Sequence, residues 1–251
     1  MNALVGIGNA LRDRRIPMRH TMSRFIVRRL AALALIFVIP VPAAADDAIM
    51  SVDQYKTAKA RTLATTYQPL LKQMREEIYH CMPWVGVQKA GIGFRQPKGA
   101  VEDDRYLSVW IMIDQDEDAR FAALPAERRA SAMFSRYGTD LLRRMAAFQP
   151  LVADPNVQGF SVVLSWLKPG TGGGAVQPVN ETLALFVDKQ TTLGFLAKRV
   201  PAGEFTRRAK FSIFDGVQDM GRLPLEVWED SFVRTFKVAN YETPKGQKCS
   251  G

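Results

Sequence analysis

The stretch Tyr106–Asp114, YLSVWIMID, is the clearest strand in the sequence and decides how the rest is interpreted. Successive side chains of a strand point to opposite sides, so these residues divide into two sets. One set is aliphatic throughout: Leu107, Val109, Ile111 and Ile113. The other set contains three further large apolar side chains: Tyr106, Trp110 and Met112. A strand that is apolar on both sides is typical of a sheet covered on both faces.

Further strands are predicted on either side of this one, because short apolar or alternating runs are bounded there by turn residues. Their ranges are Val85–Phe94, Phe160–Leu167, Glu181–Asp188 and Lys210–Asp215. The glycine-rich segment 170–174 is predicted to be a flexible hairpin loop between the second and third of these ranges.

Helices are predicted where apolar residues recur every three or four positions. Pro69 falls inside the first helical segment and predicts a kink or a break there, because proline removes a backbone donor. In the last predicted helical segment a strand is the alternative, because residues 233–238, VRTFKV, would also serve as one. The predicted helical segments are Ser51–Ile78, Pro125–Phe148, Thr192–Arg199 and Pro224–Phe236.

The order of these elements predicts an α+β fold in which helices pack on an antiparallel sheet. A helix followed by two strands occurs twice, and a C-terminal α/β extension follows. The helical sequence Leu70–Met74 also resembles Leu141–Met145. Two αββ repeats and chance convergence of strand patterns are both open explanations. No low-complexity linker divides residues 46–251, so we predict one domain.

Residues 1–45 are predicted to be an N-terminal extension and signal peptide. A short basic region contains Arg24, Arg28 and Arg29. The apolar run Leu30–Ile39 follows, and three alanines then precede a predicted cleavage point between Ala45 and Asp46. The start of the precursor is predicted at Met22. A membrane-spanning helix needs ~20 apolar residues, so a retained anchor is the weaker alternative and the mature protein is expected to have no stable membrane span.

Removal of residues 1–45 changes the charge of the protein. The whole chain has 34 basic and 25 acidic residues, and this segment holds seven arginines and one aspartate. The remaining 27 basic and 24 acidic residues give a net charge of only +3. Because nucleic-acid binding needs a clustered basic surface, we expect no nucleic-acid partner.

The two cysteines, Cys81 and Cys249, are predicted to form a disulfide, since an exported protein meets an oxidising environment. The bond would tie the C-terminal tail to the end of the first helical segment. The alternative is one buried thiol and one free thiol in the tail. The predicted signal peptide makes the periplasm or the extracellular medium the expected location of the protein.

Catalytic residues are not predicted. His80 is the single histidine of residues 46–251. Its neighbour Cys81 would point about 100° away on a helix, which makes a poor nucleophile–base pair. A hydrolase acting on an envelope polymer is the alternative, and it would need His80 or paired carboxylates from residues 102–104 or 114–118 in a cleft.

Metal and cofactor sites are not predicted either. The acidic run Asp114–Asp118 has the alternation of a calcium loop, but Ala119 stands where the loop needs glycine and Pro125 where it needs glutamate. The glycine-rich segment 170–174 lacks the Gly-Lys-Ser/Thr ending of a phosphate-binding loop.

Two groups of basic residues are notable. Arg129, Arg136 and Arg143 recur every seven residues, which predicts a solvated helix face. A second group, available to anionic lipid or polysaccharide, comprises Lys198, Arg199, Arg207, Arg208 and Lys210.

These observations favour a non-catalytic exported protein that binds a partner or ligand in the cell envelope, with self-association as a further option. If no helix of the chain covers the second face of the sheet, that face becomes the binding surface. Complete burial of Trp110, Met112 and Trp166 within one chain would exclude such a surface.

Overall fold

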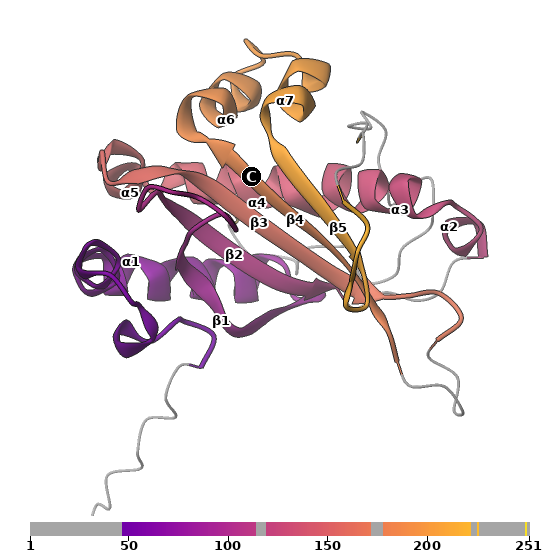
Figure 1. Ribbon diagram of the computed structural model, residues 1–251, viewed down its shortest axis with the longest axis horizontal. Coiled ribbons are helices and arrows are strands. Elements are labelled where there is room, and N and C mark those ends of the chain that lie inside the picture. Colours follow the sequence, from indigo (N-terminus) through magenta and orange to yellow (C-terminus); the bar gives the residue numbers. More distant parts are fainter. Residues whose placement is uncertain (1–46, 114–118, 172–177, 222–224, 226–248, 250–251) are drawn as a thin grey trace, which may run out of the picture. The chain divides into compact units, whose positions relative to one another are not determined.

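The computed structural model describes residues 47–113, 119–171, 178–221, 225 and 249. They form an α+β fold with a six-stranded, mostly antiparallel sheet, which confirms the predicted fold class. The strands lie side by side in the order of the sequence (Figure 1). Their bounds are β1 (Val85–Arg95), β2 (Arg105–Ile113), β3 (Val157–Leu167), β4 (Asn180–Asp188), β5 (Lys210–Asp215) and β6 (Gln218–Asp219).

One pair of strands departs from the prediction of an antiparallel sheet. Strands β2 and β3 run parallel, whereas every other neighbouring pair is antiparallel. Parallel neighbours need a long connection that returns the chain to the same end of the sheet. The described helices of that connection are α2 (Ala119–Ala122), α3 (Ala126–Met133), the π-helix η2 (Phe134–Gly138), α4 (Thr139–Ala147) and α5 (Gln149–Ala153).

The first long helix, α1 (Ala58–Cys81), begins later than predicted. Ser51 precedes only a 3-10 turn, η1 (Val52–Gln54), and Thr57 caps the helix by accepting a hydrogen bond from the backbone N–H of Ala60 at 3.3 Å. Pro69 does not divide α1. Pro69 has no backbone N–H, so the carbonyl of Thr65, four residues earlier, lacks its usual helical hydrogen bond. Both residues are exposed, and water can therefore hydrogen-bond to that carbonyl.

The second long helical segment runs from α3 through η2 into α4. A π-helical turn adds a residue to the turn and is a local irregularity in a helix. It ends at Gly138, where an added Cβ would lie 2.3 Å from the ring of Phe134. The glycine is therefore required for the phenylalanine ring to pack across the helix, and the predicted apolar stripe continues past it.

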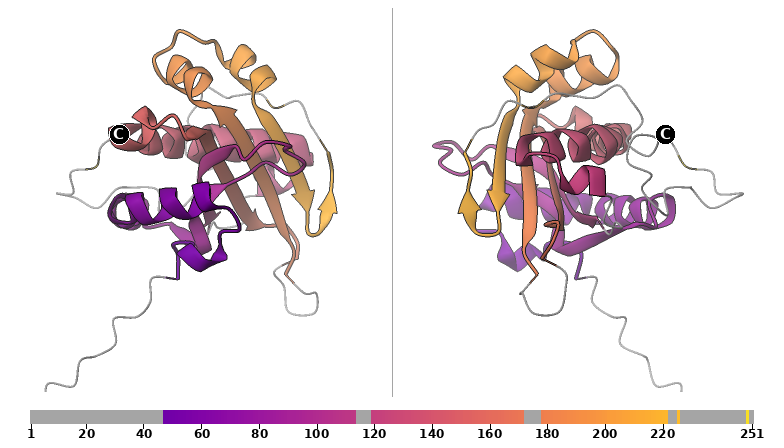
Figure 2. Two further views of the ribbon diagram at one scale, coloured as in Figure 1. Left: turned by 60° about the vertical axis from the view of Figure 1, so that its left-hand side comes forward. Right: turned by 90° about the vertical axis from the view of Figure 1, so that its right-hand side faces the viewer.

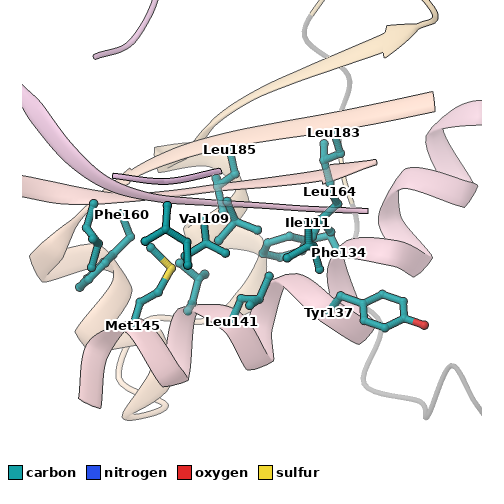
Figure 3. Close-up of a cluster of buried hydrophobic side chains, with 14 of the residues drawn as sticks. Val109, Ile111, Phe134, Tyr137, Leu141, Met145, Phe160, Leu164, Leu183 and Leu185 are labelled. Atoms are coloured by element: carbon teal, nitrogen blue, oxygen red, sulfur yellow. The ribbon is translucent and has the colours of Figure 1, made fainter. Parts of the chain in front are cut away.

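The core lies between this helical segment and one face of the sheet (Figure 3). The parallel register places Val109 opposite Val162 and Ile111 opposite Leu164, all of them buried. Residues of β4 continue the same layer across the sheet. From the helical side, the buried residues are those of the predicted stripe: Met133, Tyr137, Leu141, Met145 and Phe148.

The long helices of the described residues lie on one side of the sheet. Seen along the sheet, α1, α3 and α4 pack on the same face (Figure 2). Helices α6 (Lys189–Leu196) and α7 (Ala202–Arg208) lie at the end of the sheet between β4 and β5. Their phenylalanines stack on the core, with the rings of Phe134 and Phe205 5.8 Å apart. The helix predicted from Pro224 lies almost entirely outside the described residues.

A disulfide joins Cys81 and Cys249, as predicted, with 5.6 Å between their Cα atoms. It connects the last residue of α1 to the C-terminal tail across a separation of 168 residues. None of the described helices is long and apolar enough to cross a membrane.

Candidate functional site

The second face of the sheet is the main candidate for function, and we call it the open face. Its side chains alternate with those of the core, and no helix of the described part of the chain packs on it (Figure 2). Of the two arrangements that the sequence left open, the described residues therefore show the one in which helices cover a single face of the sheet. The large apolar side chains on this face are partly exposed: Tyr106, Trp110, Met112, Val163, Phe186 and Phe214.

The open face contains a hollow of about 590 Å³. Trp110 and Met112 of β2 form an apolar wall, and the turn at Gly216 and Val217 bounds the hollow on another side. The polar side chains that line it include Gln88, Ser165, Asn180 and Thr182. Volumes of about 300–1,000 Å³ with a few placed polar groups are typical of small-molecule sites.

A short hydrogen-bond chain fixes the tryptophan in this hollow. The indole Nε1–H of Trp110 donates to the hydroxyl of Ser165 at 2.9 Å, and the hydroxyls of Ser165 and Thr182 are 2.9 Å apart. These residues are neighbours because β2, β3 and β4 pair in register. These hydrogen bonds orient one edge of the indole, and part of the ring surface remains exposed.

A cation also lies over the ring of this tryptophan. The guanidinium carbon of Arg95 is 5.9 Å from the centre of the Trp110 ring. Its Nη2 donates to the carbonyl of Ala90 at 2.7 Å. Burial lowers the pKa of Arg95 from its usual value, with the nearby Tyr55 acting in the opposite direction.

Two neighbouring hydroxyls beneath the open face lack hydrogen-bond partners among the described residues. Ser108 and Ser161 lie opposite each other on β2 and β3, and both are fully buried. Buried hydroxyls are normally satisfied by protein or water. These two hydroxyls can therefore still form hydrogen bonds, and they lie two residues before Trp110 on β2 and Val163 on β3.

The covered face holds a different polar arrangement. The indole Nε1–H of Trp166 donates to Glu181 at 2.8 Å, and the Nε–H of Arg129 donates to the same carboxylate at 2.8 Å. Glu181 is only 3% exposed. This hydrogen-bonded charge raises the pKa of Arg129 above its usual value.

The prediction that Arg129, Arg136 and Arg143 share a solvated face is wrong for the first two. The Arg129 side chain is 11% exposed, Arg136 is partly buried and only Arg143 is half-exposed. Seven-residue spacing keeps residues on one face only in a regular helix. Because η2 lies between Arg129 and Arg143, the angular phase of the helix changes.

The residues considered for catalysis are not assembled into a described cleft. His80 is half-exposed near the end of α1, with its Nε2 3.6 Å from a carboxylate oxygen of Glu76 on the same helix. It does not line the hollow of the open face. Its neighbour Cys81 is held in the disulfide and is not a free thiol.

The other candidate sites are partly outside the described residues. The acidic run 114–118 and the predicted cleavage point between Ala45 and Asp46 both fall there. In the loop before β2, Glu102 is exposed and Asp103 pairs with Arg105. Within the described ranges, no group of three or more His, Cys, Asp or Glu residues could hold a metal ion.

Sequence reasoning identified Trp110 and Met112 but missed the polar residues of the hollow. Ser165 is separated from Trp110 by 55 positions, so no local pattern links them.

The described residues thus form an α+β fold in which helices cover one face of the sheet and a hollow lies on the other. No protein-family model, curated protein or solved structure matches the chain.

Proposed function

We propose that this protein is an exported, non-catalytic binding protein that holds a small organic ligand in the hollow beside Trp110. One observation carries the proposal: the open face is rich in apolar residues, partly exposed and hollowed to about 590 Å³. Exposed apolar surface of this kind is typical of binding sites. Trp110 and Met112 offer an apolar surface, and the polar lining offers donors and acceptors that would orient the ligand.

Export is the second part of the proposal. It rests on the basic region, apolar run and alanines of residues 24–45. The disulfide between Cys81 and Cys249 supports it, because disulfides persist in oxidising compartments. The periplasm and the extracellular medium both fit, and in either case the ligand would be met outside the cytoplasm.

A small ligand is a better fit than a macromolecular partner. Protein partners bind surfaces of roughly 800 Å² on each side, whereas this site is an open hollow lined by residues of β2, β4 and the β5–β6 turn. Face-to-face pairing of two copies is the competing use of the same residues, since it would also cover Trp110. The test must therefore report mass and stoichiometry.

Native mass spectrometry of the protein recovered from the envelope or medium of its producing cell tests both parts. We expect a chain that begins at Asp46, about 2 Da below the fully reduced mass because of the disulfide, and carrying a small ligand. A mass that retains residues 30–39 would refute export with cleavage. A bare monomer would count against a stably bound ligand, and a dimer would assign the open face to self-association.

A matched pair of variants locates the ligand. Trp110→Ala removes the apolar wall of the hollow and is expected to abolish the ligand-bound mass. Tyr79→Ala removes an aromatic side chain that is 65% exposed on α1 and lies outside the hollow, so the ligand should remain. Circular dichroism of both variants checks that they are folded. Equal retention of ligand by the two variants would place the ligand elsewhere.

A further inference from the structure

We propose that a second, basic hollow, where the end of β1 meets the start of α1, binds a small oxyanion such as a phosphate or carboxylate group. This hollow has a volume of about 350 Å³. Three basic side chains line it, and no acidic residue is among its lining in the described part of the chain. The basic residues are Lys56, Arg95 and Arg105. This site is separate from the ligand hollow of the proposed function and does not depend on it.

Arg95 is the central residue of this site. It is partly buried, yet no carboxylate of the described residues pairs with it. Its identified partners are the Ala90 carbonyl and the face of the Trp110 ring. Burial of a charge without a counter-charge is unfavourable, and this burial also lowers the pKa of Arg95. A bound oxyanion would supply the missing charge and could accept two parallel hydrogen bonds from the guanidinium group.

Arg105 provides a fixed second guanidinium. It is 8% exposed and its Nε donates to Asp103 at 2.5 Å. Its Nη2 donates to the hydroxyl of Thr57, the N-cap of α1, at 3.1 Å. These bonds hold Arg105 in place before any ligand arrives. Because Asp103 already neutralises Arg105, the free positive charge of the hollow comes from Arg95 and Lys56.

Tyr55 offers a donor with no acceptor of its own. Its side chain is almost completely buried, and its hydroxyl oxygen accepts a hydrogen bond from the backbone N–H of Phe94 at 3.0 Å. No acceptor for the hydroxyl hydrogen lies among the described residues. Burial raises the pKa of Tyr55, so the hydroxyl keeps this hydrogen at neutral pH and can donate it to an anion.

The hollow also lies next to the start of α1, which favours an anionic ligand as well. Thr57, the cap of this 24-residue helix, lines the hollow. The first backbone N–H groups of a helix carry a partial positive charge that favours anions. The charged side chains, the unused hydroxyl donor and the helix start thus all favour a negative ligand in one place.

Isothermal titration calorimetry on the protein recovered from its producing cell tests this site. Sodium phosphate and sodium acetate are titrated separately at constant ionic strength, with sodium chloride as the blank. We expect saturable one-site binding of at least one oxyanion. Stronger binding of phosphate would assign a phosphate group to the natural ligand, and stronger binding of acetate a carboxylate. The absence of saturable binding for both anions would overturn the proposal.

Charge-matched variants separate a defined site from general attraction. Arg95→Gln is expected to weaken anion binding at least about tenfold, because it removes the unpaired charge and the guanidinium fork. Arg95→Lys keeps the charge without the fork and should lie between Arg95→Gln and the parent. Arg207→Gln removes one charge from an exposed residue of α7 and should change affinity by less than about twofold. Equal weakening by Arg95→Gln and Arg207→Gln would refute a defined site.

Discussion

The two faces of the sheet carry similar apolar residues but have different surroundings. On the covered face, Val109 and Leu164 are buried under α3, η2 and α4 (Figure 3). On the open face, Trp110 and Val163, their immediate neighbours in the sequence, remain partly exposed. Apolar composition alone therefore does not determine which face becomes the core. Among the described residues, the placement of the helices on one side determines it, and the open face is the one to which we assign the proposed binding site.

The two tryptophans show the same contrast. Trp166 is 1% exposed and donates to a buried, ion-paired carboxylate, Glu181. Trp110 is partly exposed and donates to a hydroxyl, Ser165, at the wall of a hollow. The first arrangement stabilises the core, and the second orients an aromatic ring that faces solvent.

The largest expected effect concerns the disulfide that anchors α1 on the covered side. Replacing both cysteines, Cys81→Ser with Cys249→Ser, should lower the free energy of unfolding by about 5 kcal/mol, because the bond closes a loop of 168 residues in the unfolded chain. Guanidinium unfolding followed by circular dichroism measures the loss. The parent protein unfolded in reductant should match the double variant. An unchanged unfolding midpoint would contradict this role.

The next prediction compares the two faces with the same substitution. Phe160→Ala removes a fully buried ring on the covered face and should cost about 3–5 kcal/mol. Phe186→Ala removes a partly exposed ring on the open face, packed edge-on against Tyr106, and should cost about 1 kcal/mol. Urea unfolding of both variants measures the difference. Equal losses would mean that the open face is covered in solution.

Removal of a polar partner should also lower stability more on the covered face than on the open face. Glu181→Gln leaves Arg129 without its hydrogen-bonded carboxylate on the covered face and should cost about 3 kcal/mol. Ser165→Ala removes the acceptor of the Trp110 indole on the open face and should cost about 1 kcal/mol. Thermal unfolding at neutral pH compares the two variants. A larger loss for Ser165→Ala would reverse the assignment of the structural and binding faces.

The smallest expected effect concerns a hydrogen bond whose contribution to stability depends on pH. The hydroxyl of Tyr67 on α1 donates to Asp154 at 2.9 Å. Burial raises the pKa of Asp154, but hydrogen bonds from Asn156 and Tyr67 and the charge of Lys189 outweigh it and hold this pKa below its usual 3.8. Tyr67→Phe should cost about 1 kcal/mol at neutral pH.

The sign of the pH dependence follows from the lowered pKa. The native state favours the ionised carboxylate, so the stabilisation is present above pH 3.8 and is lost as the pH falls through the lower pKa of the folded state. The difference between Tyr67→Phe and the parent should therefore shrink below pH 3.8. Tyr79→Phe changes an exposed residue of the same helix and serves as the control. A difference independent of pH would exclude Asp154 as the partner.

Most strands were predictable because each has a local signature. Strand β5 has the predicted bounds, and β2 differs by one residue at each end. The helical stripe of Met133 to Phe148 was also predicted, since its spacing persists through η2. The start of α1 was missed because Ser51 and Thr57 are both acceptable caps, and only the packing of the intervening segment selects the second.

The candidate site was predictable only in part. Trp110 and Met112 were identified from the alternation of a single strand. Ser165 and Thr182 became part of the hollow through strand pairing, which has no local signature. Arg95 and Arg105 meet Thr57 across 38 and 48 positions of sequence, so the basic hollow was not predictable from spacing.

The sequence by itself determined most of the strands, the apolar stripe of the second helical segment and the two cysteines that can pair, because alternation and periodicity act over short distances. Export remains a prediction from residues 24–45. Only the tertiary structure decided that β2 and β3 run parallel, that Arg129 pairs with buried Glu181, and that the helices cover one face of the sheet. These features depend on contacts between residues far apart in the chain, whose energies no local pattern contains. Among the described residues, the hollow beside Trp110 lies on the face that the helices leave open, and the basic hollow lies where the end of β1 meets the start of α1.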